Sequence, residues 1–193
     1  MIVSKQIAQA SRIVAVMSTL ACLLGAGSAQ AGKAEKNAAK RAEIDAMAKE
    51  TLKKVTSENA GAKKLLGQAA GYAVFDNFQT SLALAGGKGV GVAVDKASDD
   101  RTYMKMKTLG VKLGLGIQKY QVVFLFQTKE RFDRFVNDGW EVESGADASA
   151  GDEGVSVDAK WSNGVASYQI TEKGLMLSVD LSGTKYYPAK KLN

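Results

Sequence analysis

Twenty glycines against a single proline constrain the fold of this 193-residue chain more than any other feature. After Gly71 the apolar residues recur at every second position in short segments, which is the period of β-strands. Glycines inside strands mark bulges, sharp coiling or close approach of two backbones. The sequence therefore predicts a strongly bent, mostly antiparallel, glycine-rich sheet or partial barrel.

Helices are expected before this sheet and once within it. From Ala34 to about Val55 the apolar residues fall on one helical face, and a shorter helix is expected from a cap at Ser57 to about Ala70. A further helix is expected at 128–138, where Thr128 can cap the first turn and Phe132, Phe135 and Val136 face inward. The fold class is therefore α+β, with N-terminal helices packed on the sheet.

Ten segments have the pattern of strands. Tyr120 to Phe126 is apolar on both faces, so it is expected to lie centrally in the sheet. The other candidates are Tyr72–Phe75, Thr80–Ala85, Gly89–Val94, Arg101–Thr108, Val111–Ile117, Glu141–Ala150, Gly154–Trp161, Val165–Ile170 and Leu175–Leu181.

The first 31 residues have the pattern of a secretory signal peptide. Lys5 and Arg12 lead into an apolar run over 13–27 and then a small-residue cleavage site before Gly32. The run has about 15 residues, whereas a membrane-spanning helix needs roughly 20. We therefore expect an exported protein without a transmembrane helix, either periplasmic or peripherally attached to the outer or inner membrane.

Cys22 offers an alternative, because a lipid-modified cysteine at a cleavage site would anchor the protein. A lipoprotein signal usually places Leu three residues before that cysteine, where this chain has Thr19, and Leu23 and Leu24 continue the apolar core after it. Removal of Cys22 with the signal is the favoured interpretation. The remaining chain would then contain no cysteine and no disulfide.

The excess of basic residues is concentrated in one segment. The chain has 26 basic and 20 acidic residues, and beyond the signal the positive excess lies within 32–64. We therefore divide the chain into a signal peptide at 1–31, a basic amphipathic helical segment at 32–64 and a domain at 65–193. The asymmetry favours anionic surfaces as partners.

The residues used by most enzymes are missing. The chain has no histidine, which is the commonest general base and zinc ligand, and the expected mature part has no cysteine. The run Gly86 to Gly91 resembles a phosphate-binding loop, but Lys88 precedes a β-patterned segment, whereas a Walker loop continues with Ser or Thr and a helix. We expect no catalytic residues, no cofactor and a strand bend or hairpin at this run.

Two acidic clusters could in principle offer oxygen ligands to calcium. They consist of Asp95, Asp99 and Asp100, and of Asp147, Asp152 and Glu153. Neither has the spacing of an EF-hand, so solvated turns are favoured and no metal site is expected.

A group of lysines is the best candidate for a binding site. Alternation in the strand candidates allows several of them to share a face beside two tyrosines, where they could contact lipid phosphates. The alternative is a solvated sheet face or a lysine-protected edge. The candidate residues are Lys88, Lys105, Lys107, Lys112, Lys119, Lys185, Tyr103 and Tyr120.

The helical segment at 32–64 also has two interpretations. It can dock on the sheet, or it can lie at a membrane interface. Its apolar face is mostly Ala with Met, Ile and Leu and has no aromatic anchor, so on its own it would bind a bilayer weakly.

The order of the motifs from Leu65 to Lys185 resembles the lipid-binding SYLF-domain family. The residues that carry the resemblance are Gly71–Phe75, Gly86-Gly87 with Gly89, Gly116-x-Gln118 leading into Val122–Phe126, Phe132 with Phe135, Gly139-Trp140, Gly145–Ser149, Gly174–Met176 and Gly183–Lys185. The chain departs from the family at Asp76, where proline is usual, and at Lys112, where glycine is expected.

The resemblance implies a non-enzymatic module that binds anionic phospholipid, here in a bacterial cell envelope. Eukaryotic relatives connect membranes to actin, but neither actin nor nucleic acid is expected as a partner in an envelope. Two alternatives remain: a structural or protein-interaction component of the envelope, and a carrier that holds an apolar ligand inside the bent sheet.

Overall fold

The computed structural model describes residues 32–79, 86–109, 119–142, 160–171, 174–176 and 184–193. The described residues fall into two units, which divide between Lys40 and Arg41. Residues 32–58 are helical. The sheet and its core belong to the unit that begins at Arg41.

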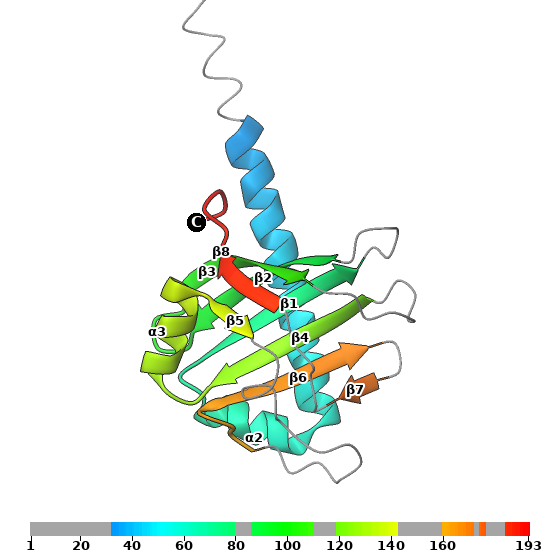
Figure 1. Cartoon of the computed structure of the whole chain (residues 1–193), viewed down its shortest axis with the longest axis vertical. Coiled ribbons are helices and arrows are strands. Elements are labelled where there is room, and N and C mark those ends of the chain that lie inside the picture. The colour runs from blue at the N-terminus through cyan, green and yellow to red at the C-terminus, as the bar shows by residue number, and fades with distance from the viewer. Residues whose placement is uncertain (1–31, 80–85, 110–118, 143–159, 172–173, 177–183) are drawn as a thin grey trace, which may run out of the picture. The chain divides into compact units, whose positions relative to one another are not determined.

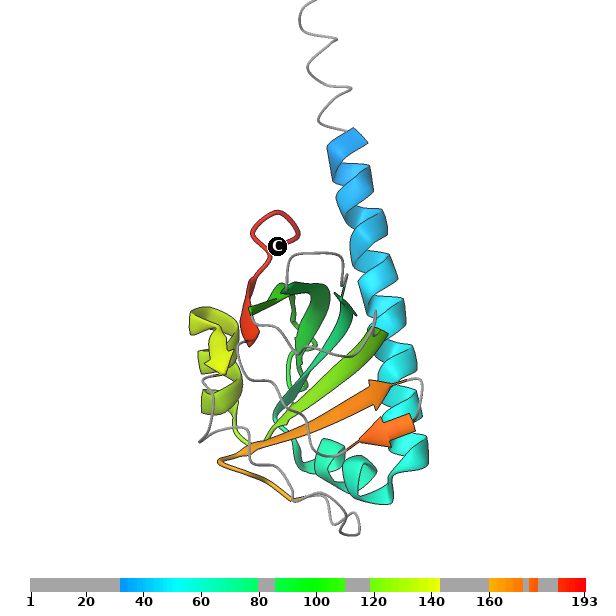
Figure 2. The same cartoon turned by 45° about the vertical axis from the view of Figure 1, so that its right-hand side comes forward.

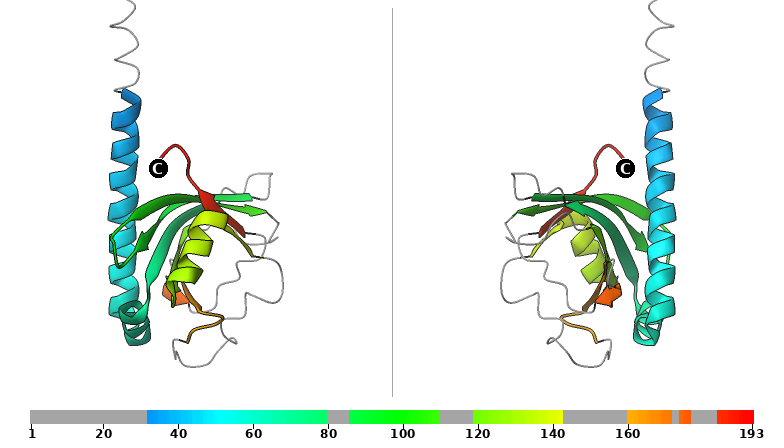
Figure 3. Two further views of the ribbon diagram at one scale, coloured as in Figure 1. Left: turned by 90° about the vertical axis from the view of Figure 1, so that its left-hand side faces the viewer. Right: turned by 90° about the vertical axis from the view of Figure 1, so that its right-hand side faces the viewer.

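Eight strands of the described residues form one sheet, in the order β5-β8-β3-β2-β1-β4-β6-β7. Every pairing is antiparallel, and β5 and β7 end the order without pairing to each other. Figure 3 shows the sheet edge-on as an arch. The expected α+β class, with helices before a bent antiparallel sheet, is confirmed. The strands are β1 (Gly71–Gln79), β2 (Gly86–Asp95), β3 (Arg101–Leu109), β4 (Lys119–Phe126), β5 (Trp140–Val142), β6 (Val165–Thr171), β7 (Gly174–Met176) and β8 (Thr184–Pro188).

One face of the sheet, called here the helix face, packs against residues 41–58 and α2 (Ala60–Gln68). Ile44, Ala48 and Val55 recur at helical spacing and are buried against valines and leucines of the sheet. Burying such a side chain stabilises the fold by about 1.5–3 kcal/mol for the larger ones. The helical segment, from Arg41 on, therefore docks on the sheet.

The boundary between the two helices differs from the expectation. The N-cap of α2 is Asn59, whose side chain accepts a hydrogen bond from the amide of Ala62 at 2.7 Å. Ser57 is still helical, and its hydroxyl donates to the carbonyl of Lys54 at 2.9 Å. Asparagine is as good a cap as serine, and it is Asn59 that lies at the break between the two helical segments.

The opposite face, called here the aromatic face, packs against α3 (Lys129–Asp138). The expected cap Thr128 accepts a hydrogen bond from the amide of Arg131, and Phe132 and Phe135 are buried while Val136 is half-buried. Rings from the sheet and from α3 meet edge-on, for example Phe75 with Phe135 at 6.2 Å between centroids. Edge-to-face pairs of this kind add stability beyond the buried area.

The glycine run at 86–91 is a strand, paired with β1 on one side and with β3 on the other. A side chain at Gly91 would collide with the carbonyl oxygen of Val74 and the ring of Phe75. Glycine at this position therefore allows close approach of β1, and the expected interpretation as strand structure holds.

Several expected strands lie outside the described residues. These are Thr80–Ala85, Val111–Ile117, all of Gly154–Trp161 except its last two residues, and most of Glu141–Ala150 and Leu175–Leu181. β4 is paired on both sides, as expected for a strand that is apolar on both faces. β8 was not among the strand candidates.

Candidate functional site

Three exposed lysines lie directly opposite one another on neighbouring strands. Lys185 of β8 pairs with Lys107 of β3, and Lys107 pairs with Lys88 of β2. The register continues from Lys88 through Phe78 of β1 to Lys119 of β4. Directly opposite residues of antiparallel strands share a face, so these positions form one line across the sheet. We call Lys88, Lys107 and Lys185 the lysine row.

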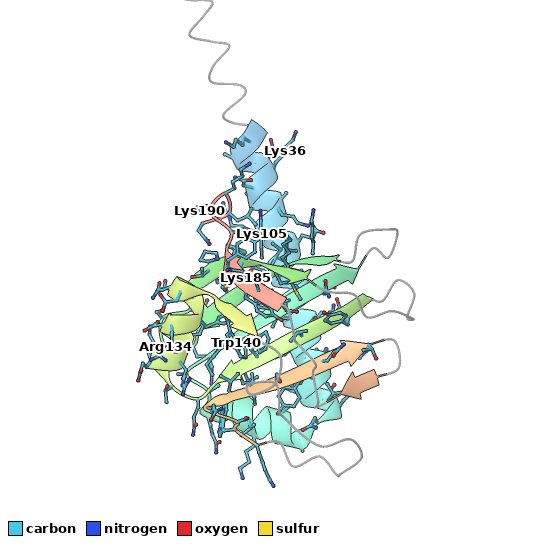
Figure 4. All side chains as sticks on the ribbon, in the orientation of Figure 1. Lys36, Lys105, Arg134, Trp140, Lys185 and Lys190 are labelled. Carbon is cyan, nitrogen blue, oxygen red and sulfur yellow. The ribbon has the colours of Figure 1, made fainter. Side chains whose placement is uncertain are left out.

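The neighbouring line adds a fourth cation and an aromatic ring. Lys105 of β3 is exposed and lies opposite Tyr187 of β8. Tyr187 is 37% exposed, which makes it the one large hydrophobic side chain classed as exposed among the described residues. Figure 4 shows Lys105 and Lys185 close to β8. An exposed ring beside cations suits contact with the interfacial region of a membrane.

The lysine row lies on the helix face, where that face changes from apolar to basic. Along β2, Val94 and Val92 are buried, Val90 is half-buried and Lys88 is exposed. Along β3, Tyr103 is buried whereas Lys105 and Lys107 are exposed. The strands that carry the core at one end therefore present cations at the other.

The charges of the lysine row are only partly balanced within the protein. Lys88, Lys105 and Lys107 form no ion pair with any residue in the described part of the chain, whereas Lys185 lies opposite Glu141 of β5 and has an interaction of its own. Like charges directly opposite one another destabilise a sheet. On the same face, Asp76 of β1 lies opposite Val90 and is exposed, and it has an interaction of its own. The arrangement is suited to binding an external anion.

Tyr103 shares the face of the lysine row but is not available to a ligand. It is only 7% exposed, and its hydroxyl donates to Asp45 Oδ2 at 2.9 Å. Burial and this hydrogen bond raise the pKa of Tyr103. Tyr103 therefore lies on the expected face beside the lysines, but the helix covers it.

Tyr120 lies on the other face of the sheet. It packs against the aromatic cluster and pairs with Asn77 of β1. Alternation along one strand does not say which face that strand shares with a strand distant in sequence, so the expectation of a common face was wrong for Tyr120. Lys112 lies outside the described residues, and of Lys119 only the backbone is described.

The sequence interpretation missed Tyr187. The segment Thr184–Pro188 alternates strictly, with Thr184 and Tyr186 buried and Lys185 and Tyr187 exposed. The residue types do not alternate in the sequence, because Tyr186 and Tyr187 are adjacent and the only proline follows them. No period of two therefore marked this strand, and Tyr187 was not found.

The first acidic cluster forms a turn. Asp95 Oδ1 accepts from the amide of Ala97 at 2.8 Å, and Oδ2 lies 3.2 Å from Lys129 Nζ. The backbone hydrogen bond above all, and the Lys129 side chain, lower the pKa of Asp95. Asp99 pairs with Arg101. No group of acidic, histidine or cysteine residues suited to a metal ion occurs in the described ranges, and the second cluster lies outside them.

Among the helices that the structure describes, none combines the length and the apolar character that crossing a bilayer requires.

Comparison with known proteins gives two matches. A family model described as Ysc84, Las17-binding protein actin regulator, matches residues 107–193. The chain is also 45% identical over 152 residues to a protein of Aeromonas veronii named beta cell expansion factor A. That match covers 79% of this chain and 58% of the relative, so the chain spans little more than half of the relative's length.

Proposed function

We propose that the protein binds anionic phospholipid without catalysing a reaction, on the premise that residues 107–193 belong to the Ysc84 family, which is the SYLF-domain family that the motifs resemble. The family is associated with lipid binding and with actin regulation. The lysine row lies partly within the matched residues, which contain Lys107 and Lys185.

The single observation that supports this proposal best is the register of the lysine row. The three lysines lie on adjacent strands, and neighbouring strands of a sheet are about 5 Å apart. Their charged side chains therefore project from closely spaced positions on one face. Each lysine near an anionic membrane surface contributes about 1 kcal/mol. The lysine row and Lys105 can therefore supply several kcal/mol without any enclosed pocket.

We propose further that this binding takes place in a bacterial cell envelope. The signal-like start of the sequence and the relative from Aeromonas veronii support that location. We assign the lipid part of the family's association to this protein and not the actin part, because actin is a cytoskeletal protein of eukaryotic cells. A role in protein interaction is the competing function.

Co-sedimentation with vesicles tests the proposal. The protein should bind vesicles that contain phosphatidylglycerol and not vesicles of phosphatidylcholine alone. Replacing the lysine row with glutamine (Lys88→Gln, Lys107→Gln and Lys185→Gln) should weaken binding by roughly 100-fold, since about 1 kcal/mol is lost at each position. Added salt should weaken wild-type binding in the same direction.

The matched control removes three exposed cations elsewhere: Arg131→Gln, Arg134→Gln and Lys160→Gln. This variant has the same net charge as the first and should retain most of the binding. Equal loss in both variants would show a response to net charge alone and would contradict a site at the lysine row. Binding to a stoichiometric protein partner, with no affinity for either vesicle, would favour the competing function.

A further inference from the structure

A second line of residues crosses the sheet on the aromatic face, opposite to the lysine row. Following the pairing from β5 to β4, the directly opposite residues are Trp140, Tyr186, Met106, Gly89, Asn77 and Tyr120. We call these residues the aromatic row, and Figure 4 labels Trp140 at its β5 end. The same face carries Phe75 and Phe124 and packs against α3.

Two members of the aromatic row carry buried polar atoms without a partner. Asn77 is 0% exposed, and neither its Oδ1 nor its Nδ2 has a hydrogen-bond partner. Tyr186 is also 0% exposed, and its hydroxyl has none either. Buried polar groups are nearly always hydrogen-bonded, because burial removes the water that would otherwise satisfy them. Two such side chains on one row indicate that a partner is missing.

The two side chains flank one place on the aromatic row, the space over Gly89 that Met106 fills. Asn77 lies opposite Gly89, and Tyr186 lies opposite Met106. The ring of Phe75 leans over β2 at Gly91 and lies 4.8 Å from the ring of Tyr186, between centroids. Asn77 follows Phe75 by two residues and therefore projects from the same face.

The region around these polar ends is uncharged. Burial raises the pKa of Tyr186 well above its usual value, with Tyr120 as a smaller cause, so the phenol stays neutral. Met106 and the buried Thr184 are the neighbouring side chains of β3 and β8 on this face. No described residue in this region offers a cation to balance an anionic ligand.

We propose that Asn77 and Tyr186, with Tyr120 beside them, bind the uncharged polar head of an apolar molecule, of which the hydroxyl of a long-chain alcohol is the simplest case. Nδ2 of Asn77 donates to the ligand oxygen, and Oδ1 accepts from its O–H. The rings of Phe75 and Phe124 contact the hydrocarbon chain. Met106 now fills the space above Gly89, and its flexible thioether must shift to admit the head.

This site is independent of the proposed function, because the lysine row lies on the other face of the sheet. Calorimetric titration of the protein with decan-1-ol and with decanoate, at a pH where decanoate is ionised, measures it directly. The alcohol should bind at least about tenfold more tightly than the carboxylate, since no positive charge faces the head.

Two variants locate the site. Tyr186→Phe removes only the hydroxyl and should weaken binding of the alcohol about tenfold. Asn77→Leu should weaken it by a similar or larger factor. Neither should lower the stability of the free protein, because each removes a polar atom that has no partner there. If Asn77→Leu does not fold, Tyr186→Phe carries the test.

The matched control is Tyr168→Phe. Tyr168 is 1% exposed and its hydroxyl also lacks a partner, but it lies on the helix face. This variant, and the glutamine variant of the lysine row, should bind the alcohol like the wild type. The proposal is overturned if the wild type does not bind the alcohol, if it binds both ligands equally, or if Tyr186→Phe binds like the wild type. An ordered water that joins Asn77 to Tyr186 and is not displaced by the alcohol would also overturn it.

Discussion

Individual glycines in this sheet have different physical roles. Gly91 lies where an added side chain would meet backbone and a packed ring, whereas Gly67 of α2 has nothing within 4 Å of the position of a Cβ. Gly91→Ala should therefore lower the free energy of unfolding by about 2 kcal/mol or more, through forced movement of a packed core. Urea denaturation measures the change.

The paired substitution Gly67→Ala should have the opposite sign. Alanine in an exposed helix is more favourable than glycine by roughly 0.5–1 kcal/mol, and no contact opposes it here. Destabilisation by both substitutions would show that space at the Cβ does not decide the effect.

At the residue scale, the sequence predicts faces within a strand better than faces between strands. Lys105 and Lys107 alternate with Met104 and Met106, and the structure has the first pair exposed and the second buried. Tyr103 has the same parity as the lysines, yet the helix covers it. Which residues of a face are covered depends on where Asp45 and Ile44 dock, and that is tertiary information.

At the scale of the elements, the cap of α2 provides a test. Asn59→Ala removes the acceptor for the amide of Ala62 and should cost about 1 kcal/mol of stability. Ser57→Ala should change stability by less than about 0.5 kcal/mol, because an exposed serine hydroxyl bonded to a carbonyl in the same helix contributes little. Thermal unfolding of both variants gives the comparison, and an equal loss would contradict the assignment of Asn59.

Helices and long strands were predictable, and the short strand β8 was not. The helix at Lys129–Asp138 agrees with the expected range because Thr128 and the paired phenylalanines are both strong local signals. β8 was missed, since five residues give little periodicity. It forms because β3 and β5 offer hydrogen bonds on its two sides, which no local pattern shows.

At the scale of the whole molecule, Asp95 links the β2–β3 turn to α3 through Lys129. Because the pKa of Asp95 is lowered in the folded state, its contribution to stability is complete above the unfolded value, near 3.8, and is lost as pH falls through the folded value. Asp95→Asn should therefore be less stable than the wild type at neutral pH, and the difference should shrink at low pH. Denaturation curves measured over a range of pH give the stability of both proteins. The same difference in stability at neutral and at low pH would exclude this linkage.

The change from apolar to basic residues along one face of β2 and β3 has a consequence for how such a protein can evolve. Deleting one residue from β3 would exchange the positions of Lys105 and Met106, so that a charge would enter the aromatic core and a thioether would face solvent. Related proteins can therefore change the charge of this surface by substitution of single residues, but not by insertion or deletion within a strand. Length variation among homologues should accordingly be confined to the connections between strands.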